Sequence, residues 1–202
     1  MTKIETIIGY HGTTKENASK IYNSQTFIPN EDEKNELFLG RGVYFYFEKN
    51  NAVFWNIKKM KEEHKKIDYI VYSSEYDILE VLIGMEEDEI LDLDKIENYF
   101  KFKKYLERVS KILNQSEIYK NAKNKDAALI NFMEKRGELE GVKIIKKIYH
   151  QRNDTFDNIR ISRTMLCVKD ENVIGPIIIS EIVTKDIFDM VYEASYGKQA
   201  YA

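Results

Sequence analysis

Two short stretches in the first quarter of the chain carry residue types from which a ligand site can be built. The first is Tyr-His-Gly-Thr at 10–13, and the second is Gly-Arg-Gly-Val-Tyr-Phe at 40–45. Imidazole supplies a hydrogen-bonding group, glycine lets a ligand approach the backbone, and an aromatic face attracts a cationic ring. Taken alone, the second stretch fits a hairpin that leads into a buried strand better than it fits a site.

The predicted neighbours of the first stretch place it where binding sites commonly occur. Ile4–Tyr10 is predicted to be a strand and Lys15–Ser24 a helix, so the histidine and glycine lie between a strand end and a helix start. Thr13 and Glu16 have the spacing of a capping box at that helix. Backbone N–H groups at a helix start are oriented to receive a carbonyl or a phosphate.

The order of these features resembles a known enzyme family. A strand ending in Tyr-His-Gly-Thr, then a helix, then Gly-x-Gly-Val-Tyr-Phe, then an aromatic residue at Phe54 or Trp55 resembles the NAD-using ADP-ribosyltransferases of the poly(ADP-ribose) polymerase and diphtheria-toxin type. The signature of that family is His, Tyr, Glu. The resemblance extends to Trp55 and, more loosely, to a strand around Cys167. It implies an α+β fold in which split antiparallel β-sheets surround an NAD cleft, with a helical insertion.

The resemblance also implies roles for individual residues. His11 is expected to hydrogen-bond the adenosine ribose, the Gly12 backbone to hold the nicotinamide amide, and Tyr44 to sandwich the nicotinamide ring together with Phe54 or Trp55. For Trp55, an ordinary place in the core is an equal alternative. The NAD-binding set expected from the resemblance is His11, Gly12, Thr13, Gly42, Tyr44, Phe54 and Trp55, with NAD as substrate and no metal.

The third signature position is where the sequence departs from the family. The implied catalytic positions are His11, Tyr44 and Met165, and methionine can neither polarise a ribose hydroxyl nor act as a base. Three explanations remain open. Glu171 or Glu181 serves instead, the acceptor needs no base, or the protein is an inactive module that binds NAD or ADP-ribose. Cys167 is a poor nucleophile candidate because apolar residues flank it in the sequence.

Composition narrows the setting. The 202 residues suit one domain, 1–202, with a helical insertion at about 95–136. The formal charge of −3 argues weakly against nucleic-acid binding by the protein as a whole, so such binding would need a local patch. One cysteine excludes an internal disulfide, and three scattered histidines offer no zinc spacing. With no apolar run near the ~20 residues that span a bilayer, we expect a reduced, cytoplasmic setting without a membrane.

The remaining pattern predicts further strands and helices. A helix capped by Asn50 or Asn51 is expected to run to about Lys65. The other predicted elements are strands at 67–73, 78–83, 165–168 and 173–183, helices at 95–113 and 126–136, a loop at 114–124, and a frayed tail after Tyr192.

Two charged segments suggest partners. Residues 75–97 hold ten acidic residues and one lysine, which indicates a solvated surface or, alternatively, a site for a basic partner such as an antitoxin. Residues 142–163 hold six basic and two acidic residues with Tyr149, His150 and Phe156 among them. The pattern fits an exposed basic face slightly better than a surface that binds phosphates. A surface that binds phosphates would favour RNA or DNA over protein as the acceptor. The resulting hypothesis is a mono-ADP-ribosyltransferase of the bacterial toxin or phage-defence type.

Overall fold

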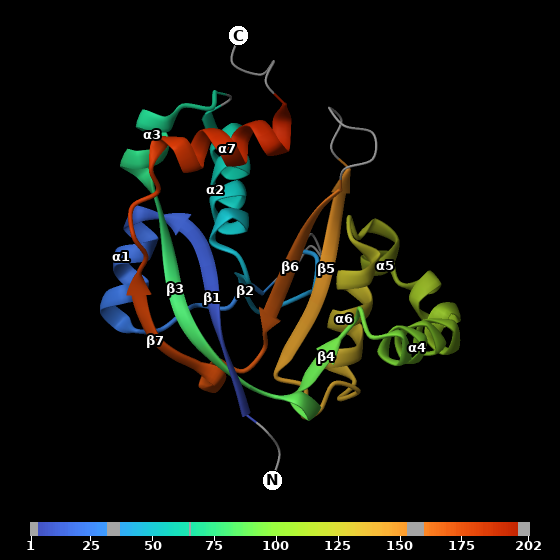
Figure 1. The fold of residues 1–202 in the computed structure, drawn as a ribbon. Helices are drawn as coiled ribbons and strands as arrows, with labels where there is room; N and C mark the ends of the chain where they lie inside the picture. The colour runs from blue at the N-terminus through green and yellow to red at the C-terminus, as the bar shows by residue number, and fades with distance from the viewer. Residues whose placement is uncertain (1–3, 32–36, 65, 153–159, 198–202) are drawn as a thin grey trace.

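The structure is a computed structural model that describes residues 4–31, 37–64, 66–152 and 160–197 (Figure 1). Its strands are β1 (Ile4–Thr14), β2 (Val43–Tyr46), β3 (Tyr76–Glu86), β4 (Ile90–Asp92), β5 (Ile144–Arg152), β6 (Arg160–Val168) and β7 (Ile174–Ile179). Its α-helices are α1 (Lys15–Ser24), α2 (Lys49–His64), α3 (Tyr69–Glu75), α4 (Ile96–Gln115), α5 (Glu117–Asn121), α6 (Lys125–Lys135) and α7 (Lys185–Tyr196), with short 3-10 turns at Glu87–Glu89 and Glu171–Val173.

The seven strands pair in the order β4-β5-β6-β2-β1-β3-β7, and every pair except β4-β5 is antiparallel. Helices and a mostly antiparallel sheet confirm the α+β class. Two separate sheets were predicted, whereas the described strands form one. Its two parts nevertheless join only at β1-β2, where a single register pair, Tyr10 with Tyr46, is formed. The sheet is therefore nearly divided at its centre.

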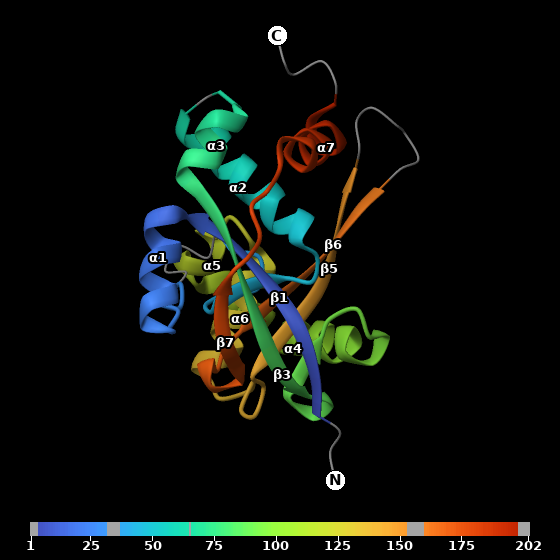
Figure 2. The ribbon, with the colours of Figure 1, turned by 60° about the vertical axis from the view of Figure 1, so that its left-hand side comes forward.

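The two faces of the sheet bury different helices (Figures 1 and 2). Alternation along the strands sends neighbouring residues to opposite sides, so Phe45 and Leu166 face one way and Tyr46 and Met165 the other. The first face packs against α1, chiefly through Ala18. The second packs against buried side chains of α2, α3, α4, α6 and α7. Both faces are thus covered near the central division.

The predicted strand at 67–73 is wrong, because a local helix cap outweighs the β-propensity of these residues. That segment contains helix α3, because the Asp68 carboxylate accepts a hydrogen bond from the Ile70 amide at 2.7 Å and so caps the helix. Its apolar residues do not alternate in burial, since Ile70 is 76% exposed while Tyr72 is buried between Tyr76 and Phe188. A side-chain cap and one buried tyrosine decide the conformation.

Several element boundaries also differ from the predictions. Strand β1 continues beyond the predicted end at Tyr10 to Thr14, and Thr14, not Thr13, caps α1 by accepting from the Asn17 amide. The predicted loop 114–124 contains α5, which Ser116 caps. Helix α2 begins at Lys49, and Lys65 lies outside the described residues. Strand β7 is shorter than the predicted 173–183, and α7 extends beyond Tyr192 to Tyr196.

The helices α4, α5 and α6 occupy the segment in which a helical insertion was predicted, and they lie beside β4 and β5 in Figure 1. Among the described residues, no helix combines the length and the apolar character needed to cross a bilayer.

Candidate functional site

A pocket lies where the two parts of the sheet separate. Beyond the pair Tyr10 with Tyr46, strand β1 continues along β3 and no longer follows β2. The imidazole of His11 lies across this gap, with its Nδ1 2.8 Å from the carbonyl oxygen of Tyr44. The pocket has a volume of about 350 Å³, within the range of small-molecule sites. It exists because β1 and β2 share one register pair and then diverge.

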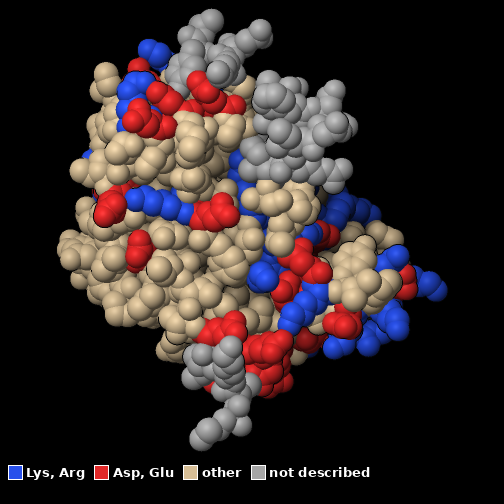
Figure 3. All heavy atoms as spheres, in the orientation of Figure 1, with Lys and Arg blue, Asp and Glu red and all other residues tan. Residues whose placement is uncertain are grey.

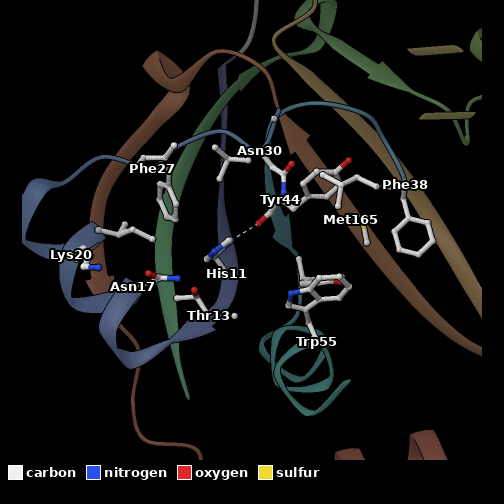
Figure 4. A pocket seen from close by; sticks show the side chains of 17 residues that line it. His11, Thr13, Asn17, Lys20, Phe27, Asn30, Phe38, Tyr44, Trp55 and Met165 are labelled. Carbon is white, nitrogen blue, oxygen red and sulfur yellow. Dashed lines mark hydrogen bonds between the residues drawn. The ribbon is translucent and has the colours of Figure 1, made fainter. Parts of the chain in front are cut away.

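Residues from four separate segments line this pocket (Figure 4). All of the residues expected at the site except Phe54 are among them. The lining comprises His11, Gly12, Thr13, Asn17, Lys20, Ile21, Phe27, Ile28, Asn30, Leu37, Phe38, Gly42, Val43, Tyr44, Tyr46, Trp55 and Met165. Positions distant in the sequence thus come together around one cavity.

Hydrogen bonding fixes the chemical character of His11. A carbonyl oxygen only accepts, so the Nδ1 atom facing Tyr44 must carry the proton. In the neutral ring, Nε2 is then an acceptor. Burial lowers the pKa of His11, the Tyr44 carbonyl opposes this, and Lys59 lowers the pKa further. The imidazole is therefore neutral near pH 7 and suited to accept a hydrogen bond from a hydroxyl.

Tyr44 is held by its own loop. Its hydroxyl donates to the Gly40 carbonyl at 2.6 Å and accepts from the Leu39 amide at 2.9 Å. These bonds fix the ring against the pocket while occupying the hydroxyl. The ring face, rather than the hydroxyl, is what Tyr44 offers to a ligand.

The glycines of this loop are required by close packing. Gly42 has a φ of +144°, and a Cβ there would lie 2.6 Å from both the Cys167 Sγ and the Val168 carbonyl oxygen. Gly40 has a φ of +73°, and a Cβ there would lie 2.3 Å from the Asn131 amide oxygen. The loop is thereby pressed between β6 and α6.

The two candidate aromatic residues of α2 lie in different surroundings. Trp55 lines the pocket, near Tyr44 and Met165 in Figure 4, and the Lys58 ammonium lies 5.1 Å from its ring centre. Phe54 packs away from the pocket, under the Arg163 guanidinium at 3.7 Å and near Tyr196. Geometry therefore favours Trp55 as the partner of Tyr44 and gives Phe54 a place in the packing of α7.

Met165 lines the pocket from β6. It is 5% exposed and lies opposite Tyr46 on β2 and Lys147 on β5. Glu171 and Glu181 do not line the pocket. Among the described residues, no carboxylate does, and none of them forms a cluster of three His, Cys, Asp or Glu side chains arranged for a metal ion.

One end of the pocket is polar, and the sequence pattern did not reveal it. Asn17 and Lys20 project from α1 beside Thr13 (Figure 4). Lys20 also pairs with Glu16 at 2.6 Å on the helix surface. Their positions four and seven residues after Thr13 fit a single helix face, which is the signal that would have identified them.

The predicted basic segment is largely neutralised. Lys143, Lys146 and Lys147 lie 2.5, 2.8 and 2.9 Å from carboxylate oxygens of Glu89, Asp92 and Asp126. Two of these partners belong to the predicted acidic segment 75–97, so the opposite charges meet across β4 and β5. The side chains of Arg152 and Arg160, and all of Phe156, lie outside the described residues. The described lysines of this segment therefore present no uncompensated positive field.

Comparison with known proteins gives one similarity. The chain is 29% identical over 134 residues to an uncharacterized protein of Methanocaldococcus jannaschii. That alignment covers 64% of this chain and 57% of the archaeal protein, so the chain spans little more than half of its relative. No protein-family model matches the chain, and no solved structure matches it either.

Proposed function

We propose that the protein is an NAD-dependent mono-ADP-ribosyltransferase whose active site is the pocket between β1 and β2. What supports the proposal is the convergence of His11, Gly12, Tyr44, Trp55 and Met165 on one cavity. These residues were singled out by sequence resemblance and come from four different elements.

The lining suits the parts of NAD. The His11 Nε2 acceptor matches a ribose hydroxyl, and the flat faces of Tyr44 and Trp55 match the cationic nicotinamide ring. Asn17 and the start of α1 offer hydrogen-bond donors at the polar end, where a pyrophosphate would be favoured, while the charge of Lys20 is shared with Glu16.

The chemistry of this pocket would be mainly positional. Nicotinamide is a good leaving group, so cleavage of its bond to ribose needs little acid catalysis. The ribose must instead be oriented while it gains positive charge. Met165 adds no charge to this step. An acceptor atom that needs little deprotonation, such as a nitrogen of a nucleic-acid base, therefore fits this site slightly better than a protein hydroxyl.

A second candidate is a module that binds NAD or ADP-ribose without turning it over. The observation that favours it is the absence of a carboxylate from the described lining, at the position where the family carries Glu. Loss of one such electrostatic contact typically lowers a rate by about 100- to 1000-fold.

The biological setting that goes with the resemblance is a bacterial toxin or phage-defence effector, held in check by an antitoxin. This part of the proposal rests on analogy alone.

One experiment separates the two candidates. The purified protein is incubated with NAD labelled in its adenylate part and with cell extract, and label is followed into protein, RNA and DNA by separate nuclease and protease digestion. A transferase transfers label to one fraction, and His11→Ala and Tyr44→Ala abolish the transfer while the proteins remain folded by circular dichroism. Tight NAD binding with no label in any fraction would instead establish the binding module.

A further inference from the structure

Positive charge in this chain is concentrated in the helical insertion. Residues 95–136 contain eleven Lys or Arg and five Asp or Glu, a net charge of +6. The whole chain carries −3, so the remaining residues carry −9. Figure 3 shows Lys and Arg atoms gathered over the region of α4 and α5, whereas acidic atoms gather near β4 and the N-terminal end of β1. The overall charge therefore conceals a local basic surface.

Helix α4 orders part of this charge into a stripe. Lys101, Lys104, Arg108 and Lys111 follow one another at helical spacings of three and four residues, so they share one face. At 1.5 Å per residue this face is about 15 Å long. In the described part of the chain, no carboxylate lies within 4.0 Å of the ammonium groups of Lys101, Lys104 or Lys111, whereas Arg108 pairs with Glu138 at 3.3 Å. We call these four residues the α4 stripe.

A groove runs along the same face. Three residues of the α4 stripe form one wall of a cavity of about 470 Å³. Its floor is apolar and includes Phe102, Met133 and Leu139. On the outer side of α4, Phe100 is 51% exposed and precedes Lys104 by four residues, which places the ring next to the stripe. A row of cations beside an exposed aromatic ring can bind a flexible polyanion that also carries planar rings.

We propose that the α4 stripe binds the phosphate backbone of a single-stranded nucleic acid, with Phe100 stacking on an unpaired base. Cationic grooves with accessible aromatic side chains are the usual means of binding single strands. The lysines of β5 do not fill this role, because each is paired with a carboxylate. This inference rests on the proposed function, because it identifies the acceptor of the proposed transfer as a nucleic acid. The binding test below does not depend on that function.

The insertion also contacts the pocket loop directly. The Asn131 side chain on α6 accepts a hydrogen bond from the Arg41 amide at 2.8 Å, between the two glycines that position Tyr44. Arg41 and Lys169 both pair with Glu134, one turn further along α6. A nucleic-acid strand bound to the α4 stripe would thus lie on the same insertion that holds the pocket loop in place.

The test is the affinity of fluorescently labelled oligonucleotides for the full-length protein, measured by anisotropy. One phosphate contact from each of the three unpaired stripe lysines predicts that raising salt from 50 to 200 mM weakens binding of a single strand about 20-fold. Lys101→Glu combined with Lys104→Glu should weaken binding at least ~10-fold and lower the salt dependence by about 1.4 in slope. Replacing both lysines by Gln should give an intermediate loss, and Phe100→Ala should weaken binding without changing the slope.

The matched control is Lys66→Glu combined with Lys185→Glu, which makes the same charge change on exposed lysines of the opposite half of the molecule. We expect it to retain binding. Equal loss in stripe and control variants, undiminished binding by the stripe variant, or no binding by the natural protein would overturn the inference. Polyglutamate that binds as tightly, with the same dependence on the stripe, would assign the surface to an acidic protein instead. NAD affinity, measured on the same samples by calorimetry, reports separately on the proposed function.

Discussion

Met165 is the residue at which the sequence and the proposed chemistry agree least. Its side chain lies in the pocket between Tyr46 and Lys147, at the register position expected for the third signature residue. We expect Met165→Gln and Met165→Glu to raise the rate of NAD cleavage, by up to about 100-fold, because each supplies a polar group that can orient ribose. The measurement is nicotinamide release under single-turnover conditions.

Two controls accompany this prediction. Met165→Ala tests whether shape alone matters, and the folded fraction of Met165→Glu must be checked because a carboxylate is costly at a site 5% exposed. An inactive Glu171→Ala or Glu181→Ala variant, beside a fully active Met165→Ala, would contradict the assignment and give the role to that glutamate.

The buried His11 makes stability depend on pH in a defined direction. Burial lowers its folded pKa, so the neutral ring is favoured in the native state. Its stabilising contribution is present above the unfolded pKa of about 6.5 and is lost as pH falls through the folded pKa. The free energy of unfolding should therefore fall by up to about 1.4 kcal/mol per pH unit as the pH drops from the unfolded pKa to the lower folded pKa, and should level off below that. Urea titrations between pH 7.5 and 5 measure this.

The matched variant is His11→Gln, which keeps a polar side chain but cannot take up the proton. Its free energy of unfolding should fall less steeply over the same range than that of the natural protein. All other side chains are common to both proteins, so the difference reports on position 11. Identical slopes would show that His11 is not held neutral by its surroundings.

At the scale of the elements, the loop before β2 depends on glycine for contact as well as for conformation. Gly42 and Gly141 both have positive φ, but only at Gly42 would a Cβ meet other atoms, 2.6 Å from the neighbouring strand. Gly141→Ala should thus cost about 1 kcal/mol from backbone strain alone, and Gly42→Ala about 2 to 4 kcal/mol. Chemical denaturation compares the two directly. Equal costs would mean that the close packing does not contribute.

The sequence predicted the elements whose patterns are governed by burial. Strand β2, helix α1 and helices α4 and α6 followed from apolar periodicity, because their apolar residues recur at the spacing of the faces that they bury. Helix α3 was missed because its β-branched residues are not buried in alternation and a local cap decides its conformation. Local hydrogen bonds of this kind carry little weight in a periodicity argument.

The candidate site was predictable only where motif and backbone coincide. His11, Gly12, Tyr44 and Met165 lie on strands whose register carries them to one place. The choice between Phe54 and Trp55 was not predictable, since adjacent helical residues point about 100° apart and the packing of α7 determines which one faces inward. Asn17 and Lys20 required knowledge of how α1 packs.

At the scale of the whole molecule, the net charge of −3 is a poor guide to partners. Acidic and basic segments that are prominent in the sequence neutralise one another across β4 and β5. Among the described residues, the lysines of the α4 stripe remain without a carboxylate partner, although no motif is recognisable in that segment. Charge must therefore be counted after folding, because pairing in space decides which groups remain available to a ligand.

The central claim is that the pocket between β1 and β2 binds NAD through an aromatic clamp, and adjacent residues of α2 test it most directly. Calorimetric titration with NAD should show binding to the natural protein and to Phe54→Ala, but at least ~10-fold weaker binding to Trp55→Ala, because only Trp55 lines the pocket. Both variants should remain folded by circular dichroism. No NAD binding by the natural protein, or equal losses in the two variants, would contradict the account.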